Sequence, residues 1–284
     1  MEMDKNASGA AAWRLLIDET ADAAWNMAAD EAMLLSLASG EALPTLRFYT
    51  WKPAAISLGY FQRADAEIDR TACARQGISV VRRLTGGRAV LHDLEVTYSL
   101  VVREGEPYIP SGVSASYLFF SRGIVAGLAR LGVAAQMQTT EIEERGNART
   151  IRSAACFDAP SQYEITVGGR KIVGSAQVRK DGVLLQHGSI LLRFCPEQMT
   201  SIMRFDNETA RTEMTAELSR RATDLSKAAG RKIEFAEAVE AMQAGIVEQC
   251  GLYLTRGVRT LTEERMLQKL ARDKYGTEAW NLRR

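Results

Sequence analysis

The chain has 284 residues, of which 46% are hydrophobic and 25% are charged. This composition is typical of a globular protein and excludes a disordered chain or a fibrous repeat. Its 36 Lys and Arg residues nearly balance its 35 Asp and Glu residues, for a net charge of +1, so no overall field would draw it onto nucleic acid or anionic lipid.

The N-terminal segment carries early acidic residues and no apolar run of signal-peptide length, and no later stretch approaches the length of a membrane span. We therefore expect a cytoplasmic protein without a membrane partner. The first predicted elements are a strand over residues 13–17 and a helix over residues 22–39. Gly40 is a plausible C-cap of this helix.

The next part interleaves strands and helices. Residues 45–51 and 55–61 read as β-rich runs, and residues 66–77 read as one helix that Gly77 closes. Further strands are expected over residues 78–84 and 88–102, with Gly86 and Gly87 between them.

Residues 114–131 predict a helix, because Tyr117, Ile124, Leu128 and Leu131 recur at helical spacing and should pack on the sheet. Three antiparallel strands are expected over residues 162–193, separated by hairpin turns at residues 168–169 and 180–182 that contain glycine. Beyond Pro196 the sequence is rich in charge and alanine, which predicts helices over residues 208–230, 235–251 and 262–276.

The stretch RRLTGGRAVLHD, residues 82–93, permits two interpretations. It is either a hairpin with exposed, solvated arginines, or a turn in which Gly86 and Gly87 let a ligand approach a backbone that lacks Cβ atoms. His92 and Asp93 alone would make a weak metal or acid–base site, so we expect them to hold the glycine turn instead.

The stretch GRKIVGSAQ, residues 169–177, places Lys171 in a strand beside three small residues, Gly174, Ser175 and Ala176. Small residues inside a strand often mark the close approach of a ligand or of another backbone. By the local pattern alone, Lys171 is a solvated lysine that follows a turn.

Cys156 lies in the loop-like stretch SAACFDAPSQYE, residues 153–164. A cysteine there is a nucleophile, a metal ligand or a small apolar filler. None of the four cysteines forms a CxxC pair, which argues against zinc and dithiol sites. We interpret Cys73, Cys195 and Cys250 as packing residues.

Together, the stretches at residues 82–93 and 169–177 resemble the biotin and lipoate protein ligase superfamily, and NMAADEAML near the start agrees. The resemblance extends from about residue 13 to the C-terminus. Within the superfamily, ACFDAPSQYE and QHGSILL look like the octanoyltransferases that load the glycine cleavage H protein.

The resemblance implies a two-step acyl transfer. Cys156 would take octanoyl from octanoyl-acyl carrier protein as a thioester and pass it to a lysine of a lipoyl domain. Lys171 would be the second catalytic residue, since a nearby ammonium lowers a thiol pKa. The route needs no histidine base, nucleotide, metal or other cofactor.

The substrate-binding residues implied by the two stretches are Arg82, Arg83, Gly86, Gly87, Arg88, His92, Gly174, Ser175 and Ala176. The three arginines would meet an acidic carrier protein or line the mouth of an acyl tunnel, and ordinary solvated arginines are the alternative.

We expect an α/β (α+β) fold with mixed, largely antiparallel sheets flanked by helices. The whole chain, residues 1–284, should form one catalytic domain and a monomer, with a core over about residues 40–254 and a helical C-terminal extension over about 255–284.

The alternatives to an octanoyltransferase are an ATP-dependent lipoate ligase and a non-catalytic acyl or carrier-protein binding module. A DNA-binding regulator is disfavoured because no helix-turn-helix precedes the domain and the net charge is near zero.

Overall fold

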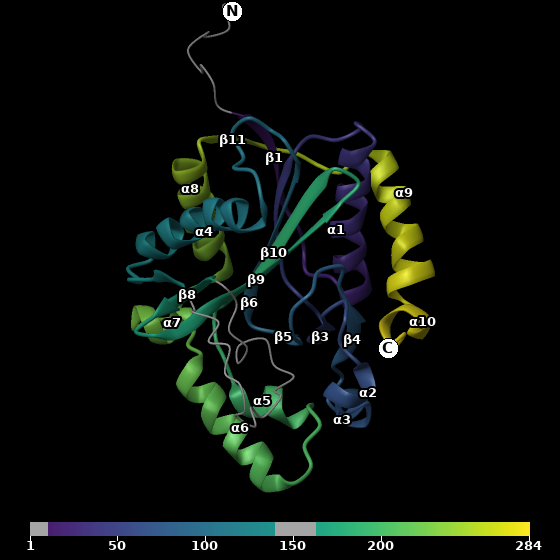
Figure 1. Ribbon diagram of the computed structural model, residues 1–284, viewed down its shortest axis with the longest axis vertical. Coiled ribbons are helices and arrows are strands. Elements are labelled where there is room, and N and C mark those ends of the chain that lie inside the picture. Colours follow the sequence, from purple (N-terminus) through teal and green to yellow (C-terminus); the bar gives the residue numbers. More distant parts are fainter. Residues whose placement is uncertain (1–10, 140–162) are drawn as a thin grey trace, which may run out of the picture.

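The computed structural model describes residues 11–139 and 163–284, and a large mixed sheet runs through its centre (Figure 1). The strand order in this sheet is β11-β1-β2-β6-β10-β9-β8-β7. The strands are β1 (Ala11–Ile17), β2 (Thr45–Tyr49), β6 (Glu95–Arg103), β7 (Gln136–Thr139), β8 (Tyr163–Val167), β9 (Arg170–Lys180), β10 (Val183–Leu191) and β11 (Leu252–Arg256). β1 pairs in parallel with β2 and β11, and the remaining pairs are antiparallel. The predicted mixed, largely antiparallel sheet is confirmed.

A second, smaller sheet has the order β4-β3-β5, with strands β3 (Ala55–Leu58), β4 (Ser79–Arg82) and β5 (Val90–His92). β3 lies between the other two, parallel to β4 and antiparallel to β5. The hairpin interpretation of residues 82–93 is therefore wrong, because β4 and β5 each pair with β3.

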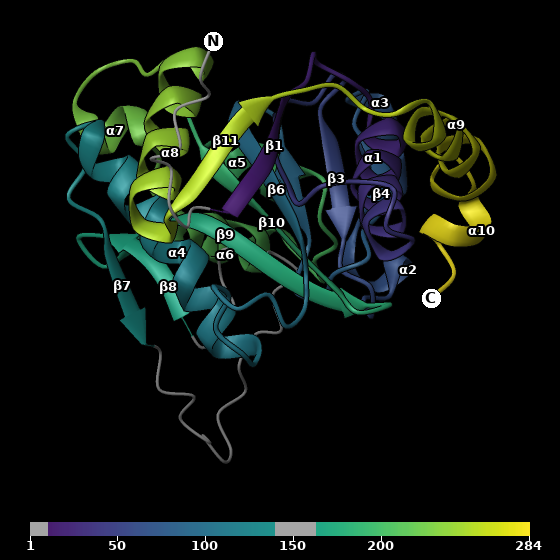
Figure 2. The same ribbon diagram turned by 90° about the horizontal axis from the view of Figure 1, so that it is seen from above.

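Helices cover both faces of the large sheet (Figures 1 and 2). They are α1 (Ala23–Ala38), α2 (Ala64–Glu67), α3 (Arg70–Arg75), α4 (Val113–Arg130), α5 (Pro196–Ser201), α6 (Glu208–Arg221), α7 (Leu225–Ala229), α8 (Phe235–Cys250), α9 (Leu261–Leu270), the π-helical turn η1 (Ala271–Tyr275) and α10 (Glu278–Asn281). α4 and α8 pack together on one face, whereas α1 lies on the other face with α9 outside it.

Two predicted helices are interrupted. The one over residues 66–77 is split into α2 and α3 because Ile68 adopts an extended conformation and bridges to Met203, after which the Asp69 side chain accepts from the amide of Ala72 and caps α3. The one over residues 208–230 ends at Arg221, and Asp224 caps α7. The sequence analysis also missed β11, a short strand whose only strand partner in the described parts is β1.

Side chains alternate between the two faces of the sheet, as strand geometry requires. On β6, Val96, Tyr98 and Leu100 enter the apolar core beneath α4 and α8. Thr97 and Ser99 point to the opposite face, which α1 covers. The pairing of Ser99 with His187 and of Thr97 with Ser189 brings a polar row of β10 beside this row of β6.

The C-terminal helices pack against the rest of the molecule. The buried carboxylate of Glu31 on α1 accepts hydrogen bonds from Lys274 Nζ at 2.6 Å and from Tyr275 Oη at 2.8 Å. The indole of Trp280 donates to the carbonyl of Arg82 at 2.9 Å. These contacts attach the predicted C-terminal extension to α1 and β4. Of the helices in the described parts, none is long and apolar enough to cross a membrane.

Candidate active site

A pocket opens between the large sheet, the small sheet and α1. It encloses about 350 Å³ of empty space, part of it open to solvent. It is lined by Met27, Tyr49, Trp51, Ser57, Arg83, Val90, His92, Thr97, Gly174, Ser175, Ala176, His187, Gly188 and Ser189. A concave, mostly apolar pocket with a few converging polar groups is the usual form of a small-molecule site.

The apolar part of the wall comes from Met27, Trp51 and Val90, and the small residues come from the paired strands β9 and β10. Gly188 has a packing requirement of its own. A Cβ there would lie 2.5 Å from Ser175 Oγ and 2.8 Å from the carbonyl oxygen of Gly174. Glycine at this position therefore lets β9 and β10 pair closely beside the pocket.

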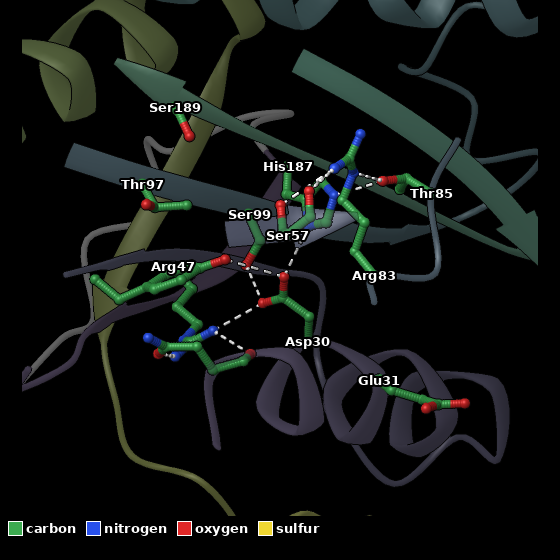
Figure 3. Close-up of polar contacts among 12 residues, drawn as sticks. Asp30, Glu31, Arg47, Ser57, Arg83, Thr85, Thr97, Ser99, His187 and Ser189 are labelled. Carbon is green, nitrogen blue, oxygen red and sulfur yellow. Dashed lines mark hydrogen bonds and ion pairs between the residues drawn. The ribbon is translucent and has the colours of Figure 1, made fainter. Parts of the chain in front are cut away.

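Behind the polar part of the wall lies Asp30 on α1, which contacts the lining residue His187 (Figure 3). Asp30 Oδ2 lies 3.0 Å from Nδ1 of His187, and Oδ1 accepts from Arg47 at 2.8 Å. His187 Nε2 lies 2.7 Å from Oγ1 of Thr85. Arg83 Nε donates to the same Thr85 oxygen at 3.1 Å.

A second chain of the same kind approaches Arg83 from the other side. Glu95 Oε1 lies 2.7 Å from Nδ1 of His92, and His92 Nε2 lies 2.7 Å from Oγ of Ser57. Arg83 donates to Ser57 Oγ at 3.1 Å. The His92 ring stacks on Trp51 with ring centroids 4.0 Å apart. Two carboxylate–imidazole–hydroxyl chains thus converge on one guanidinium.

Charges and burial set the protonation of the first chain. Burial raises the pKa of Asp30, but the hydrogen bond from His187 and the charge of Arg47 outweigh it, so the net direction is down. Burial is also the main reason that the pKa of His187 lies below its usual value. At neutral pH, Asp30 is therefore a carboxylate and His187 a neutral imidazole.

Arg82 and Arg83 are both buried, with 0% and 4% of their surface exposed, so the interpretation of these two as solvated arginines is wrong. Arg82 donates to the carbonyls of Gly59 and Gln62, on the turn after β3. Arg83 donates to the carbonyls of Gly86 and Arg88. A carrier protein cannot reach the two buried side chains, which instead hold the ends of the small sheet.

The glycine turn is shaped by contact with its own chain. A Cβ on Gly59 would lie 2.0 Å from the carbonyl oxygen of Gly87, and Gly87 has a φ of +90°, which disfavours other residues. Gly86, Gly87 and the half-buried Arg88 do not line the pocket. Arg82 is also outside its lining, whereas Arg83, His92, Gly174, Ser175 and Ala176 are part of it.

His92 does not pair with Asp93. Asp93 is exposed and lies outside the hydrogen bonds of the imidazole, whose carboxylate partner is Glu95. His92 reaches the glycine turn indirectly, through Ser57 and Arg83.

Lys171 is buried rather than solvated, with 5% of its surface exposed. Its Nζ lies 3.0 Å from Oε1 of Glu164, on the neighbouring strand β8. It lies on β9, three positions before Gly174 of the pocket lining. Cys156, the predicted nucleophile, lies outside the described residues.

The other cysteines differ from one another. Cys73 and Cys250 are buried, as expected of packing residues, but Cys195 is exposed, so its interpretation as a packing residue is wrong. Burial raises the pKa of Cys73 to about 11 and that of Cys250 to about 12. Within residues 11–139 and 163–284, no group of three or more His, Cys, Asp and Glu side chains could hold a metal ion.

Sequence reasoning missed several residues of the site, namely Asp30, Tyr49, Trp51, Ser57, Thr85, Glu95, Thr97, His187 and Ser189. A signal for some of them is present in the sequence. EVTYSLVV and LLQHGSIL each place polar residues at alternate positions of an otherwise apolar strand, which indicates a polar pocket facing one side of a buried sheet.

The chain is similar to known proteins over nearly its whole length. Residues 22–247 match the family model of the lipoyl protein ligase A/B catalytic domain. The chain is 41% identical over 273 residues to octanoyltransferase LipM of Brevibacillus brevis, covering 96% of this chain and 99% of that protein. It is 44% identical over 272 residues to octanoyltransferase LipM of Kyrpidia tusciae, with the same coverage of 96% and 99%.

Solved structures share the fold. A bipartite lipoate protein ligase from Thermoplasma acidophilum superposes with a TM-score of 0.80 at 24% identity, covering 96% of each chain. Lipoate-protein ligase A bound with ATP superposes with a TM-score of 0.75 at 25% identity, covering 95% of this chain and 98% of that one.

Proposed function

The chain belongs to the lipoyl protein ligase A/B catalytic-domain family and is an acyltransferase, and from this premise we propose that it transfers octanoyl groups in protein lipoylation. The observation that carries the proposal is similarity over nearly the whole chain, at 41% and 44% identity, to two octanoyltransferases. Fold likeness alone would not separate a transferase from a ligase.

The pocket is our proposed site for the octanoyl chain. Its apolar wall suits an unbranched hydrocarbon, since burial of each methylene contributes about 0.8 kcal/mol. Gly174 and Ala176, which line the pocket, present little side-chain volume to it. Its polar groups are already hydrogen-bonded to protein partners, so they need no polar contact from the chain.

We propose that the reaction has two steps. The Cys156 thiolate attacks the carbonyl carbon of the octanoyl thioester, and the donor leaves as a thiol after taking up a proton. The amine of the acceptor lysine, having lost its ammonium proton, then attacks the carbonyl carbon of the new thioester. The C–S bond breaks, the nitrogen gives up one further proton to solvent, and an amide and the Cys156 thiolate result. A thioester is already activated, so neither step needs a nucleotide.

The other cysteines support this choice of nucleophile by their surroundings. Cys73 and Cys250 are buried and have raised pKa values, which disfavours the thiolate that reacts. Cys195 is exposed, but it does not line the pocket. Lys171 is the proposed electrostatic partner of Cys156.

We propose octanoyl-acyl carrier protein as the donor and a lipoyl domain, such as that of the glycine cleavage H protein, as the acceptor. The proposed enzyme is a cytoplasmic monomer that forms a single catalytic domain over residues 1–284. Of the three arginines considered for contact with the carrier protein, only Arg88 reaches the surface in part.

The alternative is an ATP-dependent lipoate ligase, which the likeness to lipoate-protein ligase A bound with ATP favours. Against it, Arg88 stands in the glycine turn where ligases tend to have a third glycine. Its carbonyl accepts from Arg83 at 2.7 Å.

A direct assay distinguishes the two functions. The protein is mixed with octanoyl-acyl carrier protein, and its intact mass should rise by one octanoyl group that neutral hydroxylamine removes. Added acceptor domain should then gain the octanoyl group without ATP or magnesium. The Cys156→Ala variant should form no adduct.

A matched tube receives octanoate and ATP instead of the acylated carrier. Modification of the acceptor in that tube alone would establish the ligase. An adduct that persists in Cys156→Ala would place the nucleophile elsewhere.

A further inference from the structure

The two carboxylate–imidazole–hydroxyl chains have a direction that hydrogen-bond chemistry fixes. Arg83 is a donor at every polar contact, so Thr85 Oγ1 and Ser57 Oγ accept from it. Each hydroxyl then has its own proton to donate, and the nearest acceptor is the Nε2 atom of His187 or His92, at 2.7 Å in both cases. With the hydroxyl as the donor, each Nε2 is the ring nitrogen that lacks a proton.

The other ring nitrogens must carry the proton. Nδ1 of His187 faces the carboxylate of Asp30 at 3.0 Å, and Nδ1 of His92 faces that of Glu95 at 2.7 Å. A carboxylate accepts only, so each Nδ1 donates. The Nε2 lone pair of each ring is then occupied by the hydroxyl of Thr85 or Ser57.

We propose that Asp30 is a positioning residue, which acts through His187 and Thr85 to fix the guanidinium of Arg83 in the pocket wall. Glu95 acts in the same way through His92 and Ser57. The inference rests on the proposed function only where it concerns the acyl donor. In this role each histidine accepts a hydrogen bond from a hydroxyl through its Nε2 atom.

The chain has two histidines, so the proposal has a direct spectroscopic test. In untagged protein labelled with ¹⁵N-histidine, NMR distinguishes protonated from unprotonated ring nitrogens, and His92→Gln assigns the two rings. At pH 7.5 both rings should carry their proton on Nδ1. A ring in the Nε2–H or doubly protonated state would overturn the proposal.

Two isosteric variants should behave differently. In Asp30→Asn, the amide oxygen should stay with Arg47 and Ser99, which both donate to Asp30 Oδ1 at 2.8 Å. The amide NH₂ then faces His187 and forces its proton from Nδ1 to Nε2. Thr85 would then face two donors, His187 and Arg83.

In Glu95→Gln, the second carboxylate oxygen, Oε2, is buried without a hydrogen-bond partner, so the NH₂ group can take that position. The Gln oxygen then keeps its contact with His92, and the His92 proton should stay on Nδ1. If the spectrum of Asp30→Asn resembles that of Glu95→Gln, with the His187 proton still on Nδ1, the assigned direction of the first chain is refuted.

Enzyme kinetics test the consequence for the pocket. Asp30→Asn should raise KM for the octanoyl donor roughly tenfold, since a buried hydrogen bond in the wall is lost, while kcat changes less than about twofold. Thr85→Val should do the same with the His187 proton still on Nδ1, and Thr85→Ser should restore KM. The buried Thr200, whose hydroxyl bonds within α5 and to Thr215 of α6, lies outside the pocket lining. It provides the control variant Thr200→Val, which should leave spectra and KM unchanged.

An unchanged KM in both Asp30→Asn and Thr85→Val would overturn the positioning role. If Asp30→Asn does not fold, the wild-type spectrum still tests the tautomers, and the KM of Thr85→Val still tests the positioning role. The spectra need no substrate, so a protein with the expected tautomers that transfers no octanoyl group would refute the proposed function and leave the tautomer assignment standing.

Discussion

At the scale of single residues, the surroundings of a side chain differ from what its type suggests. Arg82 and Arg83 are of a type usually found at the surface, yet both lie inside the protein and donate to carbonyl oxygens, Arg82 through Nη1 alone. Lys171 is likewise buried, beside Glu164. Buried charges need such partners because desolvation without them is costly, so each of these residues orders the groups around it.

Lys171→Met tests the electrostatic role proposed for this lysine. A neighbouring ammonium favours the thiolate, so its removal should slow alkylation of Cys156 by iodoacetamide at pH 7 by roughly tenfold for each unit by which the thiol pKa rises. The rate should recover as the pH rises, and Lys171→Arg should lie between the variant and the parent. Peptide mass mapping follows Cys156 separately from the exposed Cys195, which serves as the control for the reagent.

The partner carboxylate offers a matched comparison. Glu164→Gln removes the anion 3.0 Å from Lys171 Nζ and should not slow alkylation of Cys156. Equal rates for Lys171→Met and the parent at every pH would show that the lysine does not activate the thiol.

At the scale of elements, close approach of two helices depends on glycine. α4 and α8 cross with their backbones in contact. A Cβ on Gly245 would lie 2.2 Å from the amide nitrogen of Gly127 and 2.4 Å from the carbonyl oxygen of Gly123. The obstacles are backbone atoms, which cannot move aside as a flexible side chain can. This crossing holds the layer that packs behind β6 and β10, opposite the pocket.

Gly245→Ala should therefore destabilise the protein, even though alanine is the better helix former. Overpacking against backbone costs typically 1–3 kcal/mol, and the gain in helix propensity offsets up to about 1 kcal/mol. We expect a net loss of about 2 kcal/mol in the free energy of unfolding, measured by urea titration. Glu240→Ala, at an exposed position of the same helix, should change it by less than about 0.5 kcal/mol.

At the scale of the whole molecule, a chain of ionic contacts links the C-terminal part to the pocket. Arg259 and Arg47 both bind Asp18, and Arg47 continues to Asp30. Glu263 on α9 accepts from both terminal nitrogens of Arg14 on β1 at 2.6 Å. We therefore expect the free energy of unfolding to depend on the protonation of the groups beside the pocket.

The sign of that dependence follows from the two lowered pKa values. Because burial lowers the pKa of His187 below its usual 6.5, the unfolded chain binds more protons there than the native one, so stability falls as the pH drops below about 6.5. Asp30, whose pKa lies below its usual 3.8, adds a further loss below about pH 4. Urea titrations should show a plateau near pH 7–8 and a decline from about pH 6.5 downward.

His187→Gln provides the comparison, since it removes the group that titrates first. The decline between about pH 6.5 and 5 should be smaller in this variant. A parent protein that gains stability on acidification from pH 7 to 5.5 would contradict the assignment of a buried neutral His187.

The sequence by itself determined the elements whose cause is local. Helix formers between Asp22 and Gly40 place α1, apolar periodicity places α4, and a run rich in alanine and charge places α8. Glycine turns place the antiparallel strands β8, β9 and β10. The resemblance carried by RRLTGGRAVLHD and GRKIVGSAQ pointed to the correct family because those residues are contiguous. Five of the site residues predicted from these two stretches line the pocket, namely Arg83, His92, Gly174, Ser175 and Ala176.

Only the tertiary structure decided which distant residues meet. Asp30 and His187 are 157 positions apart and pair because α1 crosses the face of the sheet toward which β10 points His187. His92 bonds Glu95 rather than its sequence neighbour Asp93, because β5 ends at His92 and the exposed Asp93 lies in the bend that follows, whereas Glu95 begins β6 and is buried beside the imidazole. β11 and the breaks in the predicted helices likewise depend on partners far along the chain, and long-range pairing of this kind overrides local propensity.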